Sequence, residues 1–273
     1  MLGMGASLVV ADFKRVFVYP KAVAIGIVGQ ILLLPLVGFL FASQFGLTPE
    51  FSVGLMMLVA CAGGATSNMI VYLAKGDVAL SVTLTAISSC ITVISIPFVI
   101  NFVLYEFMGA TEEAVLPIGS TNMKLFAITM LPVMLVRHYY PGFSQRLEKP
   151  INKLATVFFV LIVVGVLVKE RAAVVDVLAM AGPVTFGLNL VTMLLGFITA
   201  RLLQLNEQQS ITVSVEIGVQ NSAAEIFIAA TLLQNSEIVP TVYSLIMYLN
   251  AGLLIGMMHW YMKRSRVGMA STN

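Results

Sequence analysis

Long apolar segments, separated by short polar ones, run along almost the whole chain. A helix that crosses a membrane needs about 20 mostly apolar residues. Eight segments reach or approach this length, so the pattern predicts an all-α, polytopic bundle of membrane helices. They are residues 22–43, 51–74, 78–105, 121–137, 154–168, 177–200, 208–234 and 238–262.

The composition narrows the class of protein. Of the 273 residues, 59% are apolar and 10% are charged, whereas an average soluble domain has about 25% charged residues. This excludes a soluble enzyme, a disordered segment and a disulfide scaffold, and makes the lipid bilayer the expected surrounding. A net charge of +2 is too small to indicate a nucleic acid as partner. Cys61 and Cys90 both lie in apolar segments, so neither a disulfide framework nor a metal cluster is predicted.

The basic residues indicate the orientation of the spans, because cytoplasmic loops are enriched in Lys and Arg. If the chain crosses eight times, twelve basic residues fall on one side and three on the other. The side with twelve includes the residues that follow the last span. We therefore predict a multi-pass protein of the cell membrane with a cytoplasmic C-terminus. The twelve are Lys14, Arg15, Lys21, Lys75, Arg137, Arg146, Lys149, Lys153, Arg201, Lys263, Arg264 and Arg266.

Two of the predicted spans contain glycine and polar residues in their middle. These stretches are Ala62–Asn68 in the second span and Glu216–Ser222 in the seventh. Unwound backbone at mid-depth in a bilayer is tolerated only where it is buried in protein or lines a cavity. Paired interrupted helices in the two halves of a chain point to the binding site of a secondary transporter. We therefore expect two discontinuous helices that cross at their breaks.

The positions of the breaks also predict an internal repeat. In each half of the chain, one span follows the break. Three spans of the second half precede the second break, whereas a single span precedes the first break. An inverted repeat of five plus five helices would therefore lack its first two helices here. Residues 1–10 would be the end of the second one.

Three charged residues lie inside the predicted spans, in addition to Arg137 at the end of the fourth span. Lys124, near the outer end of its span, is expected to reach the interface. Glu216 lies in the second break, where a carboxylate costs at least about 2.5–3.5 kcal/mol and so needs a cation, a proton or a polar cavity. Glu225 is two and a half turns further on; a protonated carboxyl, a position near the outer water and a second titratable site all remain open for it.

Oxygen-bearing side chains accompany Glu216 in the spans. Ser67 and Asn68 follow the first break, and Ser81 and Thr85 lie one turn apart on one face of the third span. A hard cation such as Na⁺ is bound by several carboxylate, hydroxyl, amide and carbonyl oxygens. Hydroxyls that bond back to their own helix are the alternative for the Ser81 and Thr85 pair. Together with the glutamate, the set favours an ion site.

Three amides are the remaining polar groups of note. Gln30, in the first span, is either a hydrogen-bonding contact between helices or an ion ligand. Asn189 and Asn250 are expected to make packing hydrogen bonds, and either could contact a substrate. The chain contains no nucleophile elbow, phosphate-binding loop or metalloprotease motif, so no enzymatic activity is predicted.

Four motifs together resemble the bile acid:sodium symporter family, over essentially the whole chain. They are the stretches Gly63–Asn68, Tyr72–Val82 and Glu216–Ser222, and the entry from Asp12 through Pro20 to Gln30 and Pro35. The resemblance implies one transporter domain over residues 1–273, with an inverted repeat and two crossing broken helices. The core helices would be residues 22–105 and 177–262, and the panel helices residues 121–168 with the N-terminal residues 1–10.

The resemblance also implies residues for two sodium sites and for substrate. The family's first sodium site matches Ser67, Asn68, Ser81, Thr85 and Glu216. The second matches Gln30, Glu216 and Gln220, with backbone oxygens of Ile217 and Val219. Substrate would lie by the half-helix N-termini, next to Gly64, Ala65 and Asn221.

Three features depart from the family pattern. Ala62 stands where a proline is usual, and Ala65-Thr66 reverses the common order of the two residues, which bears on the substrate contacts. Glu225 replaces a residue that is usually small and apolar, which bears on the preference for substrate or ion. The two helices that the repeat is expected to lack would belong to the panel, and a truncated or late-started reading frame and a natural eight-helix form both remain open.

We therefore expect a sodium-coupled symporter that imports an organic anion, such as a bile acid-like compound or a small carboxylate. Two Na⁺ ions are the implied co-transported ligands, and no obligate protein partner is expected. One alternative is a proton-coupled carrier or exporter of the same fold, with Glu216 or Glu225 titrating. The other is a truncated membrane protein that does not transport.

Overall fold

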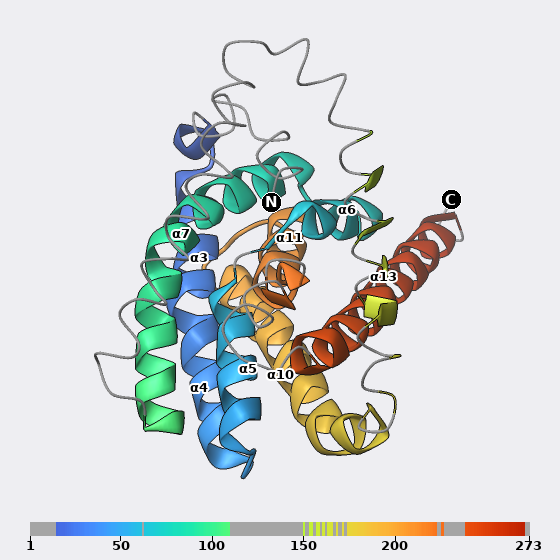
Figure 1. The fold of residues 1–273 in the computed structure, drawn as a ribbon. Helices are drawn as coiled ribbons and strands as arrows, with labels where there is room; N and C mark the ends of the chain where they lie inside the picture. The colour runs from blue at the N-terminus through green and yellow to red at the C-terminus, as the bar shows by residue number, and fades with distance from the viewer. Residues whose placement is uncertain are drawn as a thin grey trace.

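The computed structural model describes residues 15–61, 63–109, 174–222, 225–226 and 238–270, and single residues or short stretches between 150 and 171. Within these ranges every regular element is a helix, which confirms the predicted all-α class (Figure 1). The elements are η1 (Arg15–Phe17), α3 (Pro20–Val28), η2 (Gly29–Leu33), α4 (Leu34–Gln44), α5 (Pro49–Ala60), α6 (Ala65–Leu73), α7 (Val78–Met108), α10 (Val174–Leu202), α11 (Glu207–Gly218) and α13 (Ile238–Ala270).

These bounds agree with the predicted spans wherever the structure describes them. Two continuous stretches, Pro20–Gln44 and Val175–Leu202, are long and apolar enough to cross a membrane, and α7 is a third if its bent halves form one span. The predicted span 121–137 lies outside the described residues, as do residues 227–234 of the seventh span and six of the residues 154–168. The panel and the inverted repeat therefore stay predictions.

The first span contains a π-helical turn, η2, between α3 and α4. At its end the Leu34 N–H bonds to the carbonyl of Gly29, five residues back instead of four. Pro35 follows directly, and a proline has no N–H for the carbonyl four residues before it. The wider turn adapts the helix to this gap, and it places Gln30 inside the bundle, 3% exposed.

Helix α7 is bent by 44° between Val78–Thr92 and Ile94–Met108 (Figure 1). Pro97 has no backbone N–H, so the carbonyl of Val93, four residues earlier, has no helical partner. The bend falls at that residue. The part before the bend carries Ser81 and Thr85, which contact α6 and α11 at the candidate site, and α7 also packs against α5.

Helices α7 and α11, which carry Ser81, Thr85 and Glu216, begin next to each other. Asp77 caps the N-terminus of α7, accepting a hydrogen bond from the Leu80 N–H at 3.0 Å. Asn206 caps α11 in the same way, accepting from the Gln209 N–H at 2.9 Å. The Asp77 N–H also donates to the Thr212 hydroxyl at 2.8 Å. These contacts hold the turn between α6 and α7 against the start of α11.

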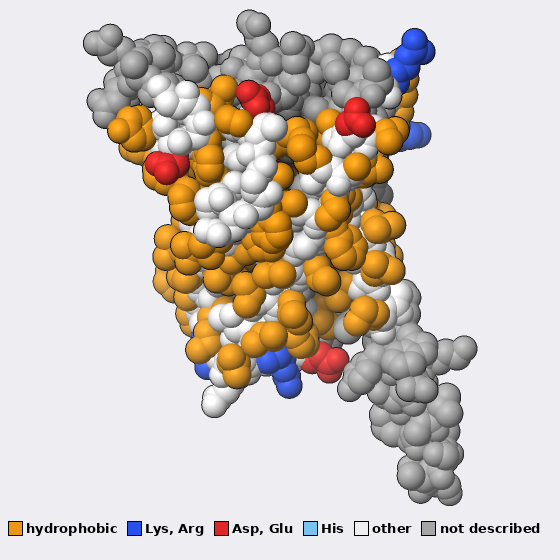
Figure 2. All heavy atoms as spheres, turned by 90° about the horizontal axis from the view of Figure 1, so that it is seen from below, with side chains coloured by type: hydrophobic (Ala, Val, Ile, Leu, Met, Phe, Trp, Pro, Cys, Tyr) orange, Lys and Arg blue, Asp and Glu red, His pale blue; other side chains and the backbone are white. Residues whose placement is uncertain are grey.

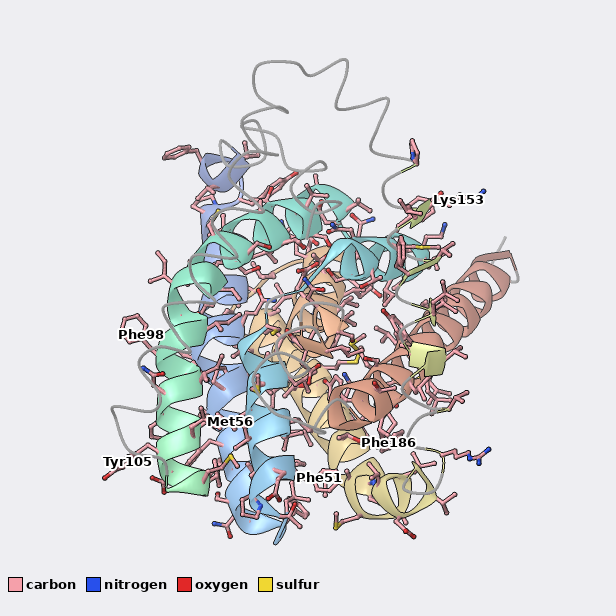
Figure 3. All side chains as sticks on the ribbon, in the orientation of Figure 1. Phe51, Met56, Phe98, Tyr105, Lys153 and Phe186 are labelled. Atoms are coloured by element: carbon pink, nitrogen blue, oxygen red, sulfur yellow. The ribbon has the colours of Figure 1, made fainter. Side chains whose placement is uncertain are left out.

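The outside of the bundle is apolar. Figure 2 shows hydrophobic side chains across the middle of one face, with charged side chains gathered towards its two ends. On α7, Phe98 and Tyr105 point away from the bundle and are 69% and 63% exposed (Figure 3). Exposed apolar side chains over the middle of a helical bundle are the surface that a bilayer covers.

Candidate functional site

The two interrupted helices meet at their breaks. The first break lies between α5 and α6, and the second follows α11 at residues 219–221. A Cβ placed on Gly63 would lie 3.2 Å from the backbone oxygen of Val219, and one on Gly64 would lie 3.5 Å from Cγ of Asn221. The absence of a side chain at Gly63 therefore allows the two backbones to approach, and the predicted crossing is confirmed.

The breaks are shorter than the sequence predicted. Ser67 and Asn68 lie in the first turns of α6, because Gly64 is extended and the Ser67 N–H already bonds to its carbonyl at 3.0 Å. The prediction that Glu216 lies in unwound backbone is wrong. It occupies the last turn of α11, which continues to Gly218 because the Val219 N–H still reaches the Val215 carbonyl at 2.7 Å.

The carboxylate of Glu216 is the centre of a buried polar cluster. Glu216 is 1% exposed and accepts three hydroxyl contacts. Its Oε1 lies 2.8 Å from the Ser67 hydroxyl and 2.6 Å from the Ser81 hydroxyl, and its Oε2 lies 3.1 Å from the Thr85 hydroxyl. The three donors come from α6 and α7, so the carboxylate joins α11 to two helices that lie more than 100 residues earlier in the chain.

Asn68 adds a further oxygen to this cluster. Its Oδ1 lies 2.6 Å from the Ser81 hydroxyl and 3.4 Å from that of Thr85. The Ser67 hydroxyl is in turn 2.7 Å from the Gly64 carbonyl. Each hydroxyl therefore faces two acceptor oxygens but has one proton to donate. The cluster therefore has more acceptor oxygens than protons to donate to them. A bound cation would interact with the oxygens that receive no proton.

Neighbouring hydroxyls on α7 behave differently. Thr83 donates to the Ala79 carbonyl at 2.9 Å and Ser89 to the Thr85 carbonyl at 2.6 Å, as hydroxyls in membrane helices commonly do. Ser81 and Thr85 instead turn to Glu216. The alternative that this pair only bonds back to its own helix is therefore wrong.

A second group of polar atoms lies beside the same helix end. The Gln30 Nε2 donates to the Glu216 backbone oxygen at 3.0 Å, and the Gln220 Nε2 donates to that of Ile217 at 2.6 Å. Both glutamines are buried, and the side-chain oxygen of each has no hydrogen-bond partner. Buried acceptors without a donor are uncommon in proteins and need an explanation. The Val219 backbone borders both groups, since its oxygen faces Gly63.

The carbonyl of Gly218, at the end of α11, is capped by a network that the sequence did not reveal. It accepts from the Asn189 Nδ2 at 2.6 Å and from the Tyr243 hydroxyl at 3.3 Å. Asn250 donates to the Asn189 Oδ1 at 2.8 Å, which confirms the predicted packing role of both asparagines. Tyr243 was missed. A buried tyrosine hydroxyl needs a partner, and that requirement is the signal that could have identified it.

The three predicted substrate residues lie at the crossing. Gly64 faces Asn221 across the two breaks, and Ala65 is the first residue of α6. Asn221 begins the next helical turn, since its carbonyl accepts the Glu225 N–H at 3.0 Å. The N-terminal end of α6 and that of this turn therefore lie close together. Glu225 itself is fully buried, so of the three alternatives left open for it, a position near the outer water is wrong.

The chain is similar in sequence to known proteins. A model of the sodium bile acid symporter family matches residues 1–177. An uncharacterized sodium-dependent transporter of Bacillus subtilis, YocS, is 28% identical and aligns with 100% of this chain and 84% of its own length. The probable sodium/metabolite cotransporter BASS1 of Oryza sativa chloroplasts is 30% identical over 84% of this chain, which spans 56% of that protein. The human P3 protein is 29% identical over 80% of this chain and 46% of its own length.

Proposed function

Because the chain belongs to the sodium bile acid symporter family, we propose that it couples the sodium gradient to the import of an organic anion. Members of this family are transporters, so the chain is a membrane transporter and not an enzyme. Two of the relatives carry sodium-dependent or sodium/metabolite transport in their names. The chain spans little more than half of the chloroplast relative, so the substrate and the ion stoichiometry are argued from its own residues.

The observation that carries the proposal is the surplus of oxygens around Glu216. The hydroxyls of Ser67, Ser81 and Thr85 each contact two acceptor oxygens, which makes six contacts. The three hydroxyls have only three protons to donate to them. Na⁺ is a hard cation that several oxygens of mixed type bind well. A sodium ion among these atoms would neutralise the carboxylate and satisfy the oxygens that no proton reaches. The first sodium site is thus proposed at Ser67, Asn68, Ser81, Thr85 and Glu216.

A second sodium ion is proposed at the end of α11. The side-chain oxygens of Gln30 and Gln220 are buried without a donor. Their amide nitrogens occupy the carbonyls of Glu216 and Ile217. Rotation of both amides would turn the two side-chain oxygens towards those carbonyls and create an oxygen-lined site, to which the Val219 carbonyl would add. Glu216 contributes to both sites, so occupation of one favours the other by holding α11 in place.

The substrate is proposed to be an organic anion because of the two helix N-termini at the crossing. A helix N-terminus carries about half a positive elementary charge and leaves backbone N–H groups without partners. Near Gly64, Ala65 and Asn221 two such ends lie close together. A carboxylate or sulfonate would be attracted there. The proposed substrates are bile acid-like compounds and small carboxylates.

Sodium and substrate would be coupled because the same breaks carry both. The sodium cluster joins α6, α7 and α11. The substrate residues lie at the start of α6 and just after the end of α11, at the crossing. Ordering of this junction by sodium would shape the anion site. When net positive charge enters the cell, the membrane potential contributes about 2.3 kcal/mol for each elementary charge and each 100 mV. Two Na⁺ ions with one monoanion would therefore make uptake electrogenic.

The proposal is tested by uptake of a radiolabelled bile acid and of a radiolabelled small carboxylic acid into vesicles that contain the purified protein. We expect uptake driven by an inward sodium gradient and none with a potassium gradient of the same size. Glu216→Ala should abolish the sodium-driven component. Thr83→Ala, which removes a hydroxyl that bonds only to its own helix, is the matched control and should keep it. Uptake that is independent of sodium, or unchanged in Glu216→Ala, would contradict the proposal.

A further inference from the structure

A second carboxylate, that of Glu225, lies just beyond the crossing. Its side chain is 0% exposed, and its N–H bonds to the carbonyl of Asn221, so it belongs to the first turn after the second break. Neither of its carboxylate oxygens has a hydrogen-bond partner. The hydroxyl of Ser222, three residues earlier and on the same face of the turn, is also buried without a partner.

Among the described residues, no positively charged group is found beside Glu225. The Cys61 thiol at the end of α5 and the Tyr243 hydroxyl of α13 are the described titratable groups within electrostatic range of its carboxylate. Both groups are neutral, and the Tyr243 hydroxyl already donates to the Gly218 carbonyl. No described Lys or Arg forms an ion pair with this carboxylate.

An ionised carboxylate in this setting is very unfavourable. Burying an unpaired charge without hydrogen bonds costs far more than burying a neutral polar group, and such groups are neutralised instead. A metal ion would need several oxygens, and no described hydroxyl or amide group forms a hydrogen bond with either carboxylate oxygen of Glu225. A thiol and a phenol are poor ligands for a hard cation. A proton needs neither space nor further ligands.

We infer that Glu225 is a proton-binding site, separate from the sodium cluster, which takes up a proton from water when the transporter adopts this conformation. The proton completes the carboxyl group, which then has an O–H to donate, and the Ser222 hydroxyl is an acceptor on the same face. This site distinguishes the chain from a carrier in which sodium alone accompanies the substrate.

The inference deepens the proposed function and rests on it in one respect. Asn221, at the proposed anion site, is one turn from Glu225. A negative charge at Glu225 would repel an organic anion and oppose the attraction of the helix N-terminus. Anion binding would therefore favour the protonated form. By reciprocity, protonation would strengthen anion binding by the same factor.

Infrared spectroscopy tests the protonation directly and without a substrate. A protonated carboxyl group has a carbonyl stretching band that a carboxylate lacks. The full-length protein would be measured at neutral pH with saturating NaCl, in a detergent without ester or carboxyl groups. We expect one such band from a buried carboxyl, absent in Glu225→Gln and present in Glu216→Gln. A spectrum that is the same in the wild type and in Glu225→Gln would overturn the inference.

Glu225→Ala provides a second variant in case Glu225→Gln does not fold, and it should also lack the band. Uptake links the site to transport. Wild-type uptake of the anion should fall as external pH is raised, whereas uptake by Glu225→Gln, which mimics the neutral form, should lose this dependence. If Glu225→Gln keeps the wild-type pH profile, the link to the substrate is refuted. Sodium-driven uptake that is absent in the wild type would refute the proposed function while leaving the infrared result valid.

Discussion

Two buried glutamates lie nine residues apart on either side of the second break, and their surroundings differ completely. Glu216 has three hydroxyl contacts from α6 and α7, all between 2.6 and 3.1 Å. Glu225 has no hydrogen-bond partner for either carboxylate oxygen, and the described titratable groups within electrostatic range of it are a thiol and a tyrosine hydroxyl. Both are at most 1% exposed, so burial alone does not distinguish them.

The difference indicates how each negative charge is neutralised. Around Glu216 the protein supplies oxygens in excess of protons, so a cation with several ligands fits there. Around Glu225 the described residues supply almost nothing, so neutralisation needs the smallest cation, a proton. The same side chain at two positions of one broken helix is thus expected to bind different ions, and what decides between them is the number of neighbouring oxygens.

The strongest test of the difference between the two glutamates removes the charge at each of them in turn. In Glu216→Gln we expect the apparent sodium affinity for uptake to fall by about 100-fold or more, because removing one partner of a buried charged contact costs about 2–5 kcal/mol. Glu225→Gln should keep the wild-type sodium affinity. The measurement is initial uptake rate against external sodium concentration at constant ionic strength.

Equal losses of sodium affinity in the two variants would show that both carboxylates are sodium ligands. In that case the distinction drawn between the two glutamates would be wrong. The amount of each variant in the vesicles, measured on the purified protein, serves as the control for expression.

A second test removes single hydroxyls near Glu216. Ser81→Ala removes the closest of its contacts, at 2.6 Å, and should weaken sodium binding about tenfold, the effect of about 1.4 kcal/mol. Thr83→Ala, two residues away, removes a hydroxyl that bonds to the Ala79 carbonyl, and should leave sodium binding unchanged. Sodium titrations followed by thermal unfolding compare the two. A similar loss in both variants would mean that α7 is perturbed as a whole.

The close approach of the breaks gives a third test. In Gly63→Ala the new methyl group would lie 3.1 Å from Oε2 of Glu216 and 3.2 Å from the Ser67 hydroxyl, so the cluster must shift. Sodium affinity should fall about fivefold, since overpacking of this kind costs about 1–3 kcal/mol. Gly252→Ala on α13, where nothing lies within 4 Å of the new methyl group, is the control. Unchanged sodium affinity in Gly63→Ala would contradict the proposed position of the site.

The smallest effect is expected for the cap of α11. Tyr243→Phe removes the hydroxyl that donates to the Gly218 carbonyl and accepts from Asn189. Asn189 still donates to that carbonyl at 2.6 Å, so the free energy of unfolding should fall by only about 1 kcal/mol. Thermal unfolding in detergent measures this. A complete loss of sodium binding in Tyr243→Phe would show that the hydroxyl does more than cap the helix.

The outline of this architecture could be predicted from the sequence. The apolar segments gave the first three spans and the sixth to within a few residues, because burial in lipid demands long uninterrupted hydrophobic helices. The spacing of Ser81 and Thr85 placed them correctly on one face of α7. Glycines marked both breaks, and at Gly63 a Cβ would be tight against the backbone oxygen of Val219.

Other features depend on contacts that no local pattern encodes. The exact end of α11 is decided by one backbone hydrogen bond to Val215, so Glu216 was expected in the break although it lies in the helix. The role of Tyr243 depends on α13 passing the end of α11. The difference between Glu216 and Glu225 depends on which side chains of other helices reach each carboxylate. The spacing of residues along the sequence does not determine these contacts.

The central claim is that the oxygens around Glu216 bind sodium, and thermal unfolding of the purified protein in NaCl and in KCl at equal ionic strength tests it most directly. A ligand that binds the folded state at 100 times its Kd stabilises that state by about 2.7 kcal/mol. We predict that Na⁺ raises the unfolding temperature of the wild type and of Glu225→Gln relative to K⁺, and that this difference disappears in Glu216→Gln. A sodium-specific rise that persists unchanged in Glu216→Gln would contradict the claim.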